Sequence, residues 1–376
     1  MKKHLIAAAV AGAFAVPAMA QVTISGNFDA GYVSAKTADG QTFRGIQSGA
    51  TSTSKLIISA SEDLGGGLRA NIMANTTVVV DRAATFQRNI NPNLGTGVAA
   101  TSATNQGFPF GDRNLYVGLS GGFGEVRIGR NQSLSDGNLN TLIADGSVWT
   151  YFMANSAAQG GVNVNFGSAA PVLGAAGRIS DSVVYRSPVI NGFQVQALRG
   201  WGERDNLASE GAVTEASISY AAGPISVSYS MGEIAAAPND ASTFAALSAS
   251  ASQAALNAAS AGSKSTENRL MASYNLGVAR LAAGYYNQEV GTAAKDSAWH
   301  VTVAVPAGAL TFGGTYMNVK DGSGTGADKD KDGYSLNVRY ALSKRTYGYA
   351  FYRTMDKTSS HTSKPSAFYL GMNHAF

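Results

Sequence analysis

The chain has 376 residues, of which 45% are hydrophobic and only 14% are charged. Typical soluble domains carry about 25% charged residues, so the composition is poor in ions for a soluble protein. The formal net charge of +4 is too balanced for nucleic-acid binding, and the sequence has neither a basic helix nor an RNA-binding motif. The absence of cysteine excludes a disulfide scaffold, a thiolate metal site and thiol catalysis.

The first twenty residues are predicted to be a signal peptide. Lys2 and Lys3 form a positive region, Leu5 to Val16 an apolar region, and Ala18-Met19-Ala20 a cleavage site. After Gln21 no apolar run approaches the ~20 residues that a membrane-spanning helix needs. We therefore expect residues 1–20 to be removed after Ala20 and residues 21–376 to form one exported domain.

The remainder repeats segments of about ten residues in which apolar and polar side chains alternate, as in strands with two different faces. Tight turns and longer loops join them alternately. The pattern gives about sixteen strands, an even number, with both ends of the chain at the short-turn end. The predicted strands are 22–34, 54–61, 68–80, a hairpin over 113–130, 181–186, 193–199, 213–220, 225–231, 269–276, 278–288, 297–305, 310–319, 334–340, 347–353 and 367–376.

One hairpin opens into an unusually long loop. Leu115, Val117 and Leu119 alternate with polar residues before the Gly121-Gly122 turn, and the second strand ends near Arg130. Roughly fifty residues, 131–180, then lack a strong strand pattern, and loops of this length in a compact domain are usually functional.

Parity assigns one apolar and one polar face to each strand. A polar interior made of Asn, Ser, Gln, Thr and charged residues cannot be dry, because each unpaired buried polar group costs about 1 to 3 kcal/mol. A barrel with lipid outside and water inside fits, whereas a soluble β-sandwich is disfavoured by the leader, the strand number and the aromatic strand ends. The aromatic residues predicted at the membrane interfaces are Tyr285, Trp299, Tyr316, Tyr340, Tyr347 and Tyr349.

Several blocks of sequence resemble the general porins of Gram-negative bacteria, of the betaproteobacterial and neisserial type. They span nearly all of 21–376, although in the second strand only Lys55 matches a common cationic pattern, with Ile57 and Ser59 departing from it. The blocks are Val22–Gly26 with Asp29–Gly31, Ser61–Leu68, Tyr116–Ser120 with Phe123-Gly124 and Ile128–Arg130, Tyr340–Thr346 and Gly371–Phe376.

The resemblance implies an all-β transmembrane barrel of sixteen antiparallel strands in the bacterial outer membrane, with the long third loop folded into the lumen. It implies a homotrimer in contact with outer-membrane lipid and lipopolysaccharide. It also implies that Phe376 is read by the barrel-assembly machinery.

In such a channel, selectivity depends on charges on the lumen wall and on the inserted loop. We predict a constriction wall of Lys55, Arg69 and Arg127, with Arg130 at the root of the loop, opposed by the loop acids Asp136 and Asp145. Each arginine could instead be solvated in a wide vestibule or paired with an acid, and either aspartate could cap a turn. The inward acids are mainly Glu125 and Glu215, and the further inward bases are Arg186, Arg269, Arg280 and Arg339.

Bases outnumber acids on the predicted inner face, so the sequence favours a diffusion porin for small hydrophilic solutes and ions, with moderate anion preference. A substrate-specific channel is the alternative, disfavoured because the inward faces read as small and polar rather than aromatic. A barrel enzyme or adhesin is a weaker alternative, because His300, His361 and His374 show no catalytic arrangement. No cofactor or metal is expected: residues 328–333 copy half of a calcium loop, but the twelfth position is Arg339.

Overall fold

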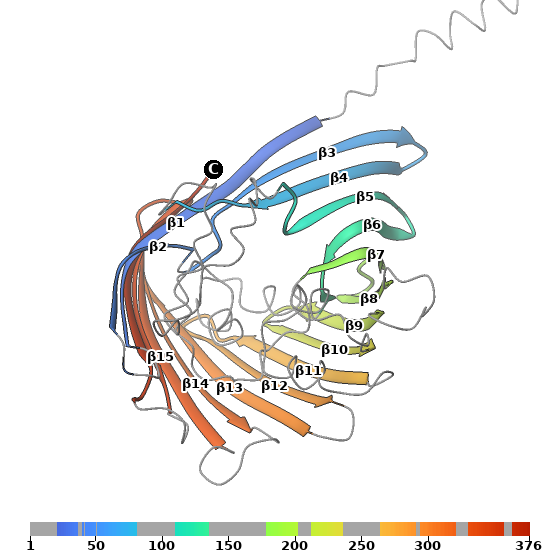
Figure 1. Cartoon of the computed structure of the whole chain (residues 1–376). Helices are drawn as coiled ribbons and strands as arrows, with labels where there is room; N and C mark the ends of the chain where they lie inside the picture. The colour runs from blue at the N-terminus through green and yellow to red at the C-terminus, as the bar shows by residue number, and fades with distance from the viewer. Residues whose placement is uncertain are drawn as a thin grey trace, which may run out of the picture.

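The structure, a computed structural model, describes residues 21–36, 40, 42–49, 51–80, 110–134, 178–201, 212–235, 264–290, 294–320, 330–356 and 363–376. Over these ranges the chain forms seventeen strands in one closed antiparallel sheet (Figure 1). No helix in the described part is long and apolar enough to cross a membrane. The predicted leader, 1–20, and nearly all of the loop 131–180 lie outside the described residues.

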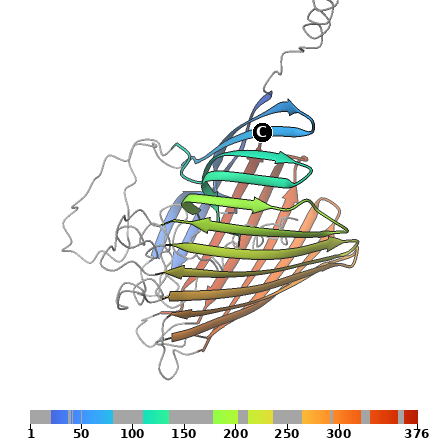
Figure 2. The ribbon, with the colours of Figure 1, turned by 90° about the vertical axis from the view of Figure 1, so that its right-hand side faces the viewer.

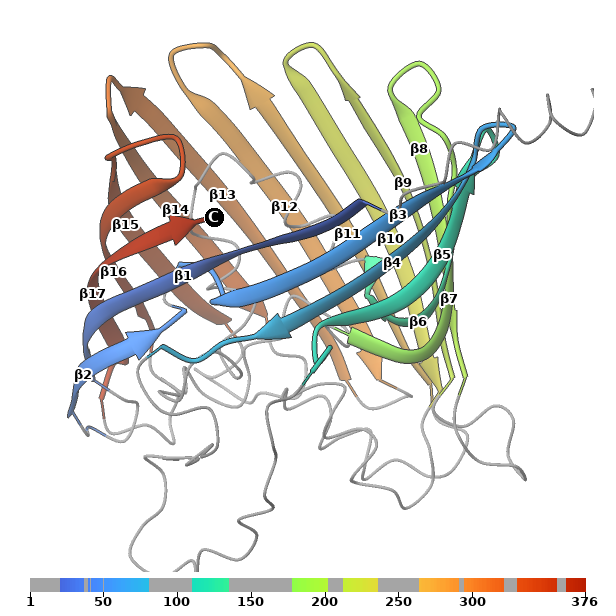
Figure 3. The ribbon, with the colours of Figure 1, turned by 90° about the horizontal axis from the view of Figure 1, so that it is seen from above.

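The strands follow one another around the barrel in chain order. They tilt within the wall (Figure 2), and the short turns that join them in pairs lie at one end of the barrel (Figure 3). Their bounds are β1 (Gln21–Lys36), β2 (Thr42–Ser48), β3 (Lys55–Gly65), β4 (Leu68–Thr77), β5 (Asn114–Gly121), β6 (Gly124–Gln132), β7 (Arg178–Arg186), β8 (Phe193–Gly200), β9 (Val213–Ala222), β10 (Ile225–Ala235), β11 (Lys264–Asn275), β12 (Arg280–Val290), β13 (Ala294–Ala307), β14 (Leu310–Lys320), β15 (Asp330–Ala341), β16 (Thr346–Met355) and β17 (Ser366–Ala375).

β1 closes the barrel by pairing on both of its edges. One edge meets β17 from Asn27 to Lys36. The other edge meets β2 and then β3, so these two strands share one position in the wall. The barrel therefore has sixteen strand positions, and the sixteen-stranded prediction is confirmed, although β2 was not predicted.

A break separates β2 from β3. Ala30 of β1 pairs with Ser48, whereas Asn27 pairs with Lys55. Two residues of β1, Phe28 and Asp29, therefore face the six residues 49–54, which cannot all lie in the plane of the sheet. This segment is an unusually large bulge in the second strand position.

The alternation of faces is confirmed along most strands. Large apolar side chains such as Val117 (58% exposed), Leu336 (60%) and Leu370 (56%) point outward, where a hydrocarbon environment would cover them. Tyr285, Trp299, Tyr316 and Tyr340 are also exposed on this side, as expected for interfacial aromatics.

Two aromatic assignments were wrong. In β16 the outward positions are Gly348, Ala350 and Tyr352, so Tyr347 and Tyr349 lie on the inner face. Parity fixes this placement, because neighbouring residues of a strand point to opposite faces.

The inner face carries an aromatic cluster on one side of the barrel, contrary to the expectation that it would be mostly small and polar. Phe351 and Tyr369 stack with ring centroids 4.3 Å apart, and Tyr349 lies 6.0 Å from Phe351. Such ring pairs are stabilising beyond the area that they bury. The buried members of the cluster are Val33, Ala35, Met271, Tyr286, Ala298, Met317, Val319, Tyr349, Phe351, Met355, Ala367 and Tyr369.

A pair of glycines makes room for Tyr349 at the closing edge. Gly31 of β1 pairs with Gly371 of β17. A Cβ atom on Gly371 would lie 2.4 Å from the Tyr349 hydroxyl and 2.6 Å from the Ala30 carbonyl oxygen. Glycine at both positions thus lets the tyrosine lie flat across the seam.

We expect Gly371→Ala to lower the unfolding free energy of the barrel by about 1 to 3 kcal/mol, because overpacking must displace Tyr349 or the β1 backbone. The measurement is urea unfolding in lipid vesicles, followed by tryptophan fluorescence. Gly348→Ala is the control, since its nearest neighbour would be the Gly371 carbonyl oxygen at 3.8 Å. Equal stability of both variants would contradict the close packing of the seam.

Candidate functional site

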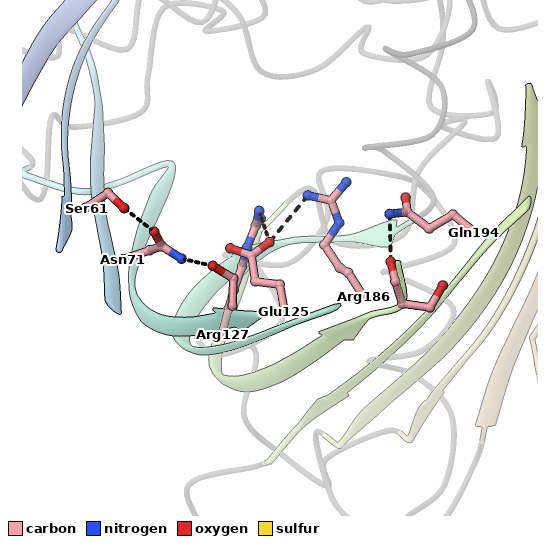
Figure 4. A network of polar contacts seen from close by, with 8 residues as sticks. Ser61, Asn71, Glu125, Arg127, Arg186 and Gln194 are labelled. Atoms are coloured by element: carbon pink, nitrogen blue, oxygen red, sulfur yellow. Dashed lines mark hydrogen bonds and ion pairs between the residues drawn. The ribbon is translucent and has the colours of Figure 1, made fainter. Parts of the chain in front are cut away.

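Two arginines share one glutamate on the inner wall. Glu125 and Arg127 are two residues apart in β6 and so point the same way, and Glu125 pairs across the strands with Arg186 of β7. The Glu125 Oε2 atom lies 2.7 Å from Arg127 Nη2 and 3.8 Å from Arg186 Nη1 (Figure 4). The group therefore keeps an excess of one positive charge.

Neighbouring polar side chains extend this group along the wall. Ser61 donates to Asn71 Oδ1 at 2.9 Å, and Asn71 Nδ2 donates to Ser120 at 2.9 Å (Figure 4). Arg69 Nε donates to the same Ser61 hydroxyl at 3.1 Å, which holds this predicted wall base on the inner face.

A cavity of about 310 Å³ adjoins the two arginines. Its lining combines guanidinium, amide and hydroxyl groups, including Arg127, Arg186, Gln194, Gln196 and Ser219. Gln194 Nε2 also donates to the Ser187 carbonyl oxygen at 3.0 Å (Figure 4). Such a lining offers hydrogen-bond partners to water and to small anions.

Lys55 is inward as predicted, but it lies far from Arg69. Lys55 pairs with Thr77, whereas Arg69 pairs with Asp63, eight residues further along the same hairpin. At about 3.3 Å per residue the two bases stand roughly 26 Å apart along the strands. The structure thus divides the predicted wall of Lys55, Arg69 and Arg127 into two groups.

Lys55 has two basic neighbours that the sequence analysis missed. Arg113 and Arg178 lie close enough to repel its ammonium group. Arg113 stands at the edge of a predicted strand and Arg178 fell within the predicted loop 131–180, so parity gave no reliable direction for either. The only available signal was that a base precedes β5 and another begins β7.

Arg130 lies apart from both groups. It pairs with Leu115 of β5, whose side chain is 43% exposed on the outer face, and it lies within a bulge of the β6–β7 pairing between Gly129 and Asn131. Its Nε donates to the Asp112 carbonyl oxygen at 2.8 Å and its Nη1 to the Ser180 hydroxyl at 2.6 Å. Asp136 and Asp145, the predicted loop acids, lie outside the described residues.

The inner arginines repeatedly lie over tyrosine rings. A ring fixes the guanidinium and contributes attraction without cancelling its charge, as a carboxylate would. Of the further predicted bases, Arg269 and Arg339 belong to this set and Arg353 was missed, while Arg280 begins β12 on the inner face. The distances from Cζ to the ring centroid are 4.6 Å for Arg127 over Tyr116, 5.2 Å for Arg269 over Tyr286, 3.8 Å for Arg339 over Tyr347 and 5.6 Å for Arg353 over Tyr369.

Glu215 holds the root of the long loop. Its side chain is 2% exposed and accepts hydrogen bonds from the Ser133 hydroxyl at 2.8 Å and from the Leu134 amide at 2.6 Å. Gly232 pairs with both Glu215 and Glu267, so the two acids stand on either side of a residue without a side chain. Glu215 is thus a structural acceptor and is withdrawn from the water-filled path.

Within the described ranges no group of three or more His, Asp or Glu side chains could hold a metal ion. His300 is 3% exposed and lies beside Gly284, while His374 points outward and lies 2.8 Å from the Thr346 hydroxyl. His361 lies outside the described residues.

A closed antiparallel barrel with an apolar exterior and a polar, charged interior defines a channel of the bacterial outer membrane. The sequence agrees with this class, because residues 7–360 match the family of Gram-negative porins. The chain belongs to that family, and it is an outer-membrane diffusion porin.

Individual proteins are similar to this chain over different shares of its length. Outer membrane porin protein 32 of Delftia acidovorans is 26% identical over 96% of this chain and 92% of its own length. The major outer membrane protein P.IB of Neisseria meningitidis serogroup B is 33% identical over 37% of each chain. The anion-selective porin from Comamonas acidovorans has the same fold, with a TM-score of 0.68, 21% identity and coverage of 95% of this chain and all of that one.

We expect Glu215→Ala to lower the unfolding free energy by about 2 to 4 kcal/mol and to increase open-channel current noise. The substitution leaves the buried Leu134 amide without its acceptor. Urea unfolding and single-channel recording in planar bilayers are the measurements. Glu233→Ala is the control, because this glutamate of β10 is exposed and pairs only with exposed Lys264. Quiet, fully stable channels would contradict the anchoring role.

Proposed function

We propose that this porin passes small hydrophilic anions in preference to cations. The observation that carries the proposal is the group formed by Glu125, Arg127 and Arg186, where two bases share one acid beside a polar cavity. A wall with excess positive charge concentrates anions and repels cations. The similar fold of a porin described as anion-selective supports the same assignment.

The charge balance elsewhere on the inner wall supports this preference. Glu215 and Asp29 face inward but are buried and bound to neighbouring groups, with exposures of 2% and 0%. Lys55 and Arg339 keep partial exposure, as do Arg69 and Arg280. Permeating ions therefore meet more accessible bases than accessible acids.

General diffusion fits better than a substrate-specific channel. An aromatic track guides a solute only when its rings face the solute, whereas Tyr349, Phe351 and Tyr369 are 4%, 2% and 1% exposed. Catalysis is not part of the proposal, because buried His300 has neither the exposure nor a nucleophile–acid arrangement to act as a base.

The proposal includes a cleaved leader 1–20, a homotrimer, contacts with outer-membrane lipid and lipopolysaccharide, and insertion by the barrel-assembly machinery through Phe376. Phe376 exchanges backbone hydrogen bonds with Gly26, and its ring lies 5.3 Å from that of Phe28. The terminal residue thus completes the seam only when β1 is in place, which suits a signal that is read before closure.

We expect the wild-type channel to show a reversal potential of the sign set by chloride in a potassium chloride gradient. Arg127→Glu and Arg186→Glu should each reduce or reverse it, because each changes the local charge by two units. Glu125→Gln should increase it by removing the only acid of the group. Planar-bilayer recording of the purified native oligomer is the measurement, and Lys344→Glu, in an exposed turn, is the control.

Absence of stepwise conductance would refute the channel function itself. An open channel that responds equally to Arg127→Glu and to Lys344→Glu would preserve the porin and reject this charge group as its filter. Arg69→Glu tests whether the neighbouring base, held by Ser61, contributes to the same filter.

A further inference from the structure

Asp29 is the most completely enclosed acid of the described inner wall. It lies in β1 on the same face as Asn27 and Val33, whereas Phe28 and Tyr32 are exposed on the outer face. Its exposure is nevertheless 0%. The described residues of the bulge, 49 and 51–54, cover it from the inside, so they lie against the lumen face of the wall.

The carboxylate of Asp29 binds that segment and two neighbouring strands at once. Its Oδ2 atom accepts hydrogen bonds from the amides of Thr51 and Ser52, both at 3.2 Å, and from the Thr51 hydroxyl. Asn373 Nδ2 of β17 donates to the same atom at 3.1 Å. The Tyr349 hydroxyl of β16 donates to Oδ1 at 2.8 Å.

The Asp29 backbone holds both ends of the bulge. Its carbonyl oxygen accepts from the Gly49 amide at 2.8 Å and from the Ser54 hydroxyl at 3.0 Å, and its amide donates to that hydroxyl at 2.8 Å. Asn27 Nδ2 adds a bond to the Thr53 carbonyl oxygen at 3.2 Å. No ion pair among the described residues includes Asp29, so neutral donors satisfy the acid.

The bulge leads directly into the inner-wall base Lys55. Lys55 follows Ser54, and its position in the wall is set by pairing with Asn27, two residues from Asp29. The six residues between Ser48 and Lys55 face only two residues of β1. They cannot follow a fixed path unless some group accepts hydrogen bonds from their amides. The carboxylate supplies that acceptor for Thr51 and Ser52, while the backbone of the same residue binds Gly49 and Ser54.

We propose that Asp29 is a positioning residue of the pore: it clamps residues 49 and 51–54 onto the inner wall as a second inward-folded element and thereby fixes Lys55 beside Arg113 and Arg178. The consequence for ion preference rests on the proposed function. The clamp itself does not rest on the proposed function. Its test therefore measures both the accessibility of the segment and the selectivity of the channel.

The chain has no cysteine, so Thr53→Cys provides a single thiol within the bulge. Thr53 is 6% exposed, and a charged methanethiosulfonate should modify the cysteine slowly in the assembled oligomer. Adding Asp29→Ala should accelerate modification at least tenfold. Tyr349→Phe removes one donor and should give a smaller acceleration, about threefold. The control pairs Thr53→Cys with Glu233→Ala, which removes an exposed acid of β10 that pairs with Lys264 and belongs neither to the bulge nor to the proposed charge group.

Selectivity provides the second readout. Tyr349→Phe changes no charge, so a reversal potential closer to zero would report displacement of Lys55. Tyr286→Phe is its control, a buried inner-wall tyrosine whose hydroxyl donates to Gln288 at 2.8 Å instead. Adding Lys55→Gln should abolish the difference between Tyr349→Phe and the parent channel.

Unchanged thiol reactivity in both Asp29→Ala and Tyr349→Phe would overturn the clamp. If Asp29→Ala does not assemble, Tyr349→Phe alone decides, since it retains the acid. Faster thiol modification with an unchanged reversal potential would keep the clamp and reject its link to Lys55. If the wild-type channel shows no anion preference but Asp29→Ala still accelerates thiol modification, the proposed selectivity is rejected and the clamp is kept.

Discussion

Closure of the sheet is the constraint on which the rest of the structure depends. A barrel wall in hydrocarbon cannot leave a strand edge unpaired, because no water is present to satisfy its amide and carbonyl groups. Here β1 meets β17 through ten consecutive residue pairs, from Asn27–Ala375 to Lys36–Ser366. The glycines of this seam let Tyr349 cross it, and the hydroxyl of Tyr349 reaches the carboxylate that holds the adjacent bulge. Closure and the shape of the pore wall therefore share one set of contacts.

The inward acids perform two different tasks. Glu125 stays partly exposed between two arginines, so its charge acts within the proposed filter. Asp29 and Glu215 are buried and accept backbone amides from segments that leave the plane of the wall. A carboxylate used in this way accepts several hydrogen bonds at one point, which a neutral side chain cannot match. The arginines that lie over tyrosine rings keep their charge, whereas the charge of the two buried acids, Asp29 and Glu215, is enclosed.

Sequence periodicity predicted the barrel and most of its faces, because a period of two is a property of every strand and survives without tertiary information. It failed where the chain departs from regular pairing. β2 was missed because its seven residues share a wall position with β3 across a bulge that no local pattern reveals. Arg130 stands on the outer face next to a second bulge.

Site assignment failed for a further physical reason. Lys55 and Arg69 share a face, but the distance between them depends on register, and a face pattern contains no register. Tyr347 and Tyr349 of β16 were assigned to the membrane interface because tyrosine occurs both at such interfaces and on packed inner faces. Arg353 was overlooked although its parity in β16 matched that of Tyr349, since only the structure reveals its ring partner, Tyr369.

The resulting lumen has two unlike sides, and this difference indicates where ions pass. The face built by β1, β11–β14, β16 and β17 packs aromatic and methionine side chains that are almost fully buried, so water is excluded from them. The cavity lies on the other side, against strands β5 to β10, where amides, hydroxyls and two arginines line it. An ion requires continuous hydration or polar replacement along its path. The aromatic side therefore serves as a rigid support for the seam, and the proposed selection by charge falls to the polar side, where Glu125, Arg127 and Arg186 lie together.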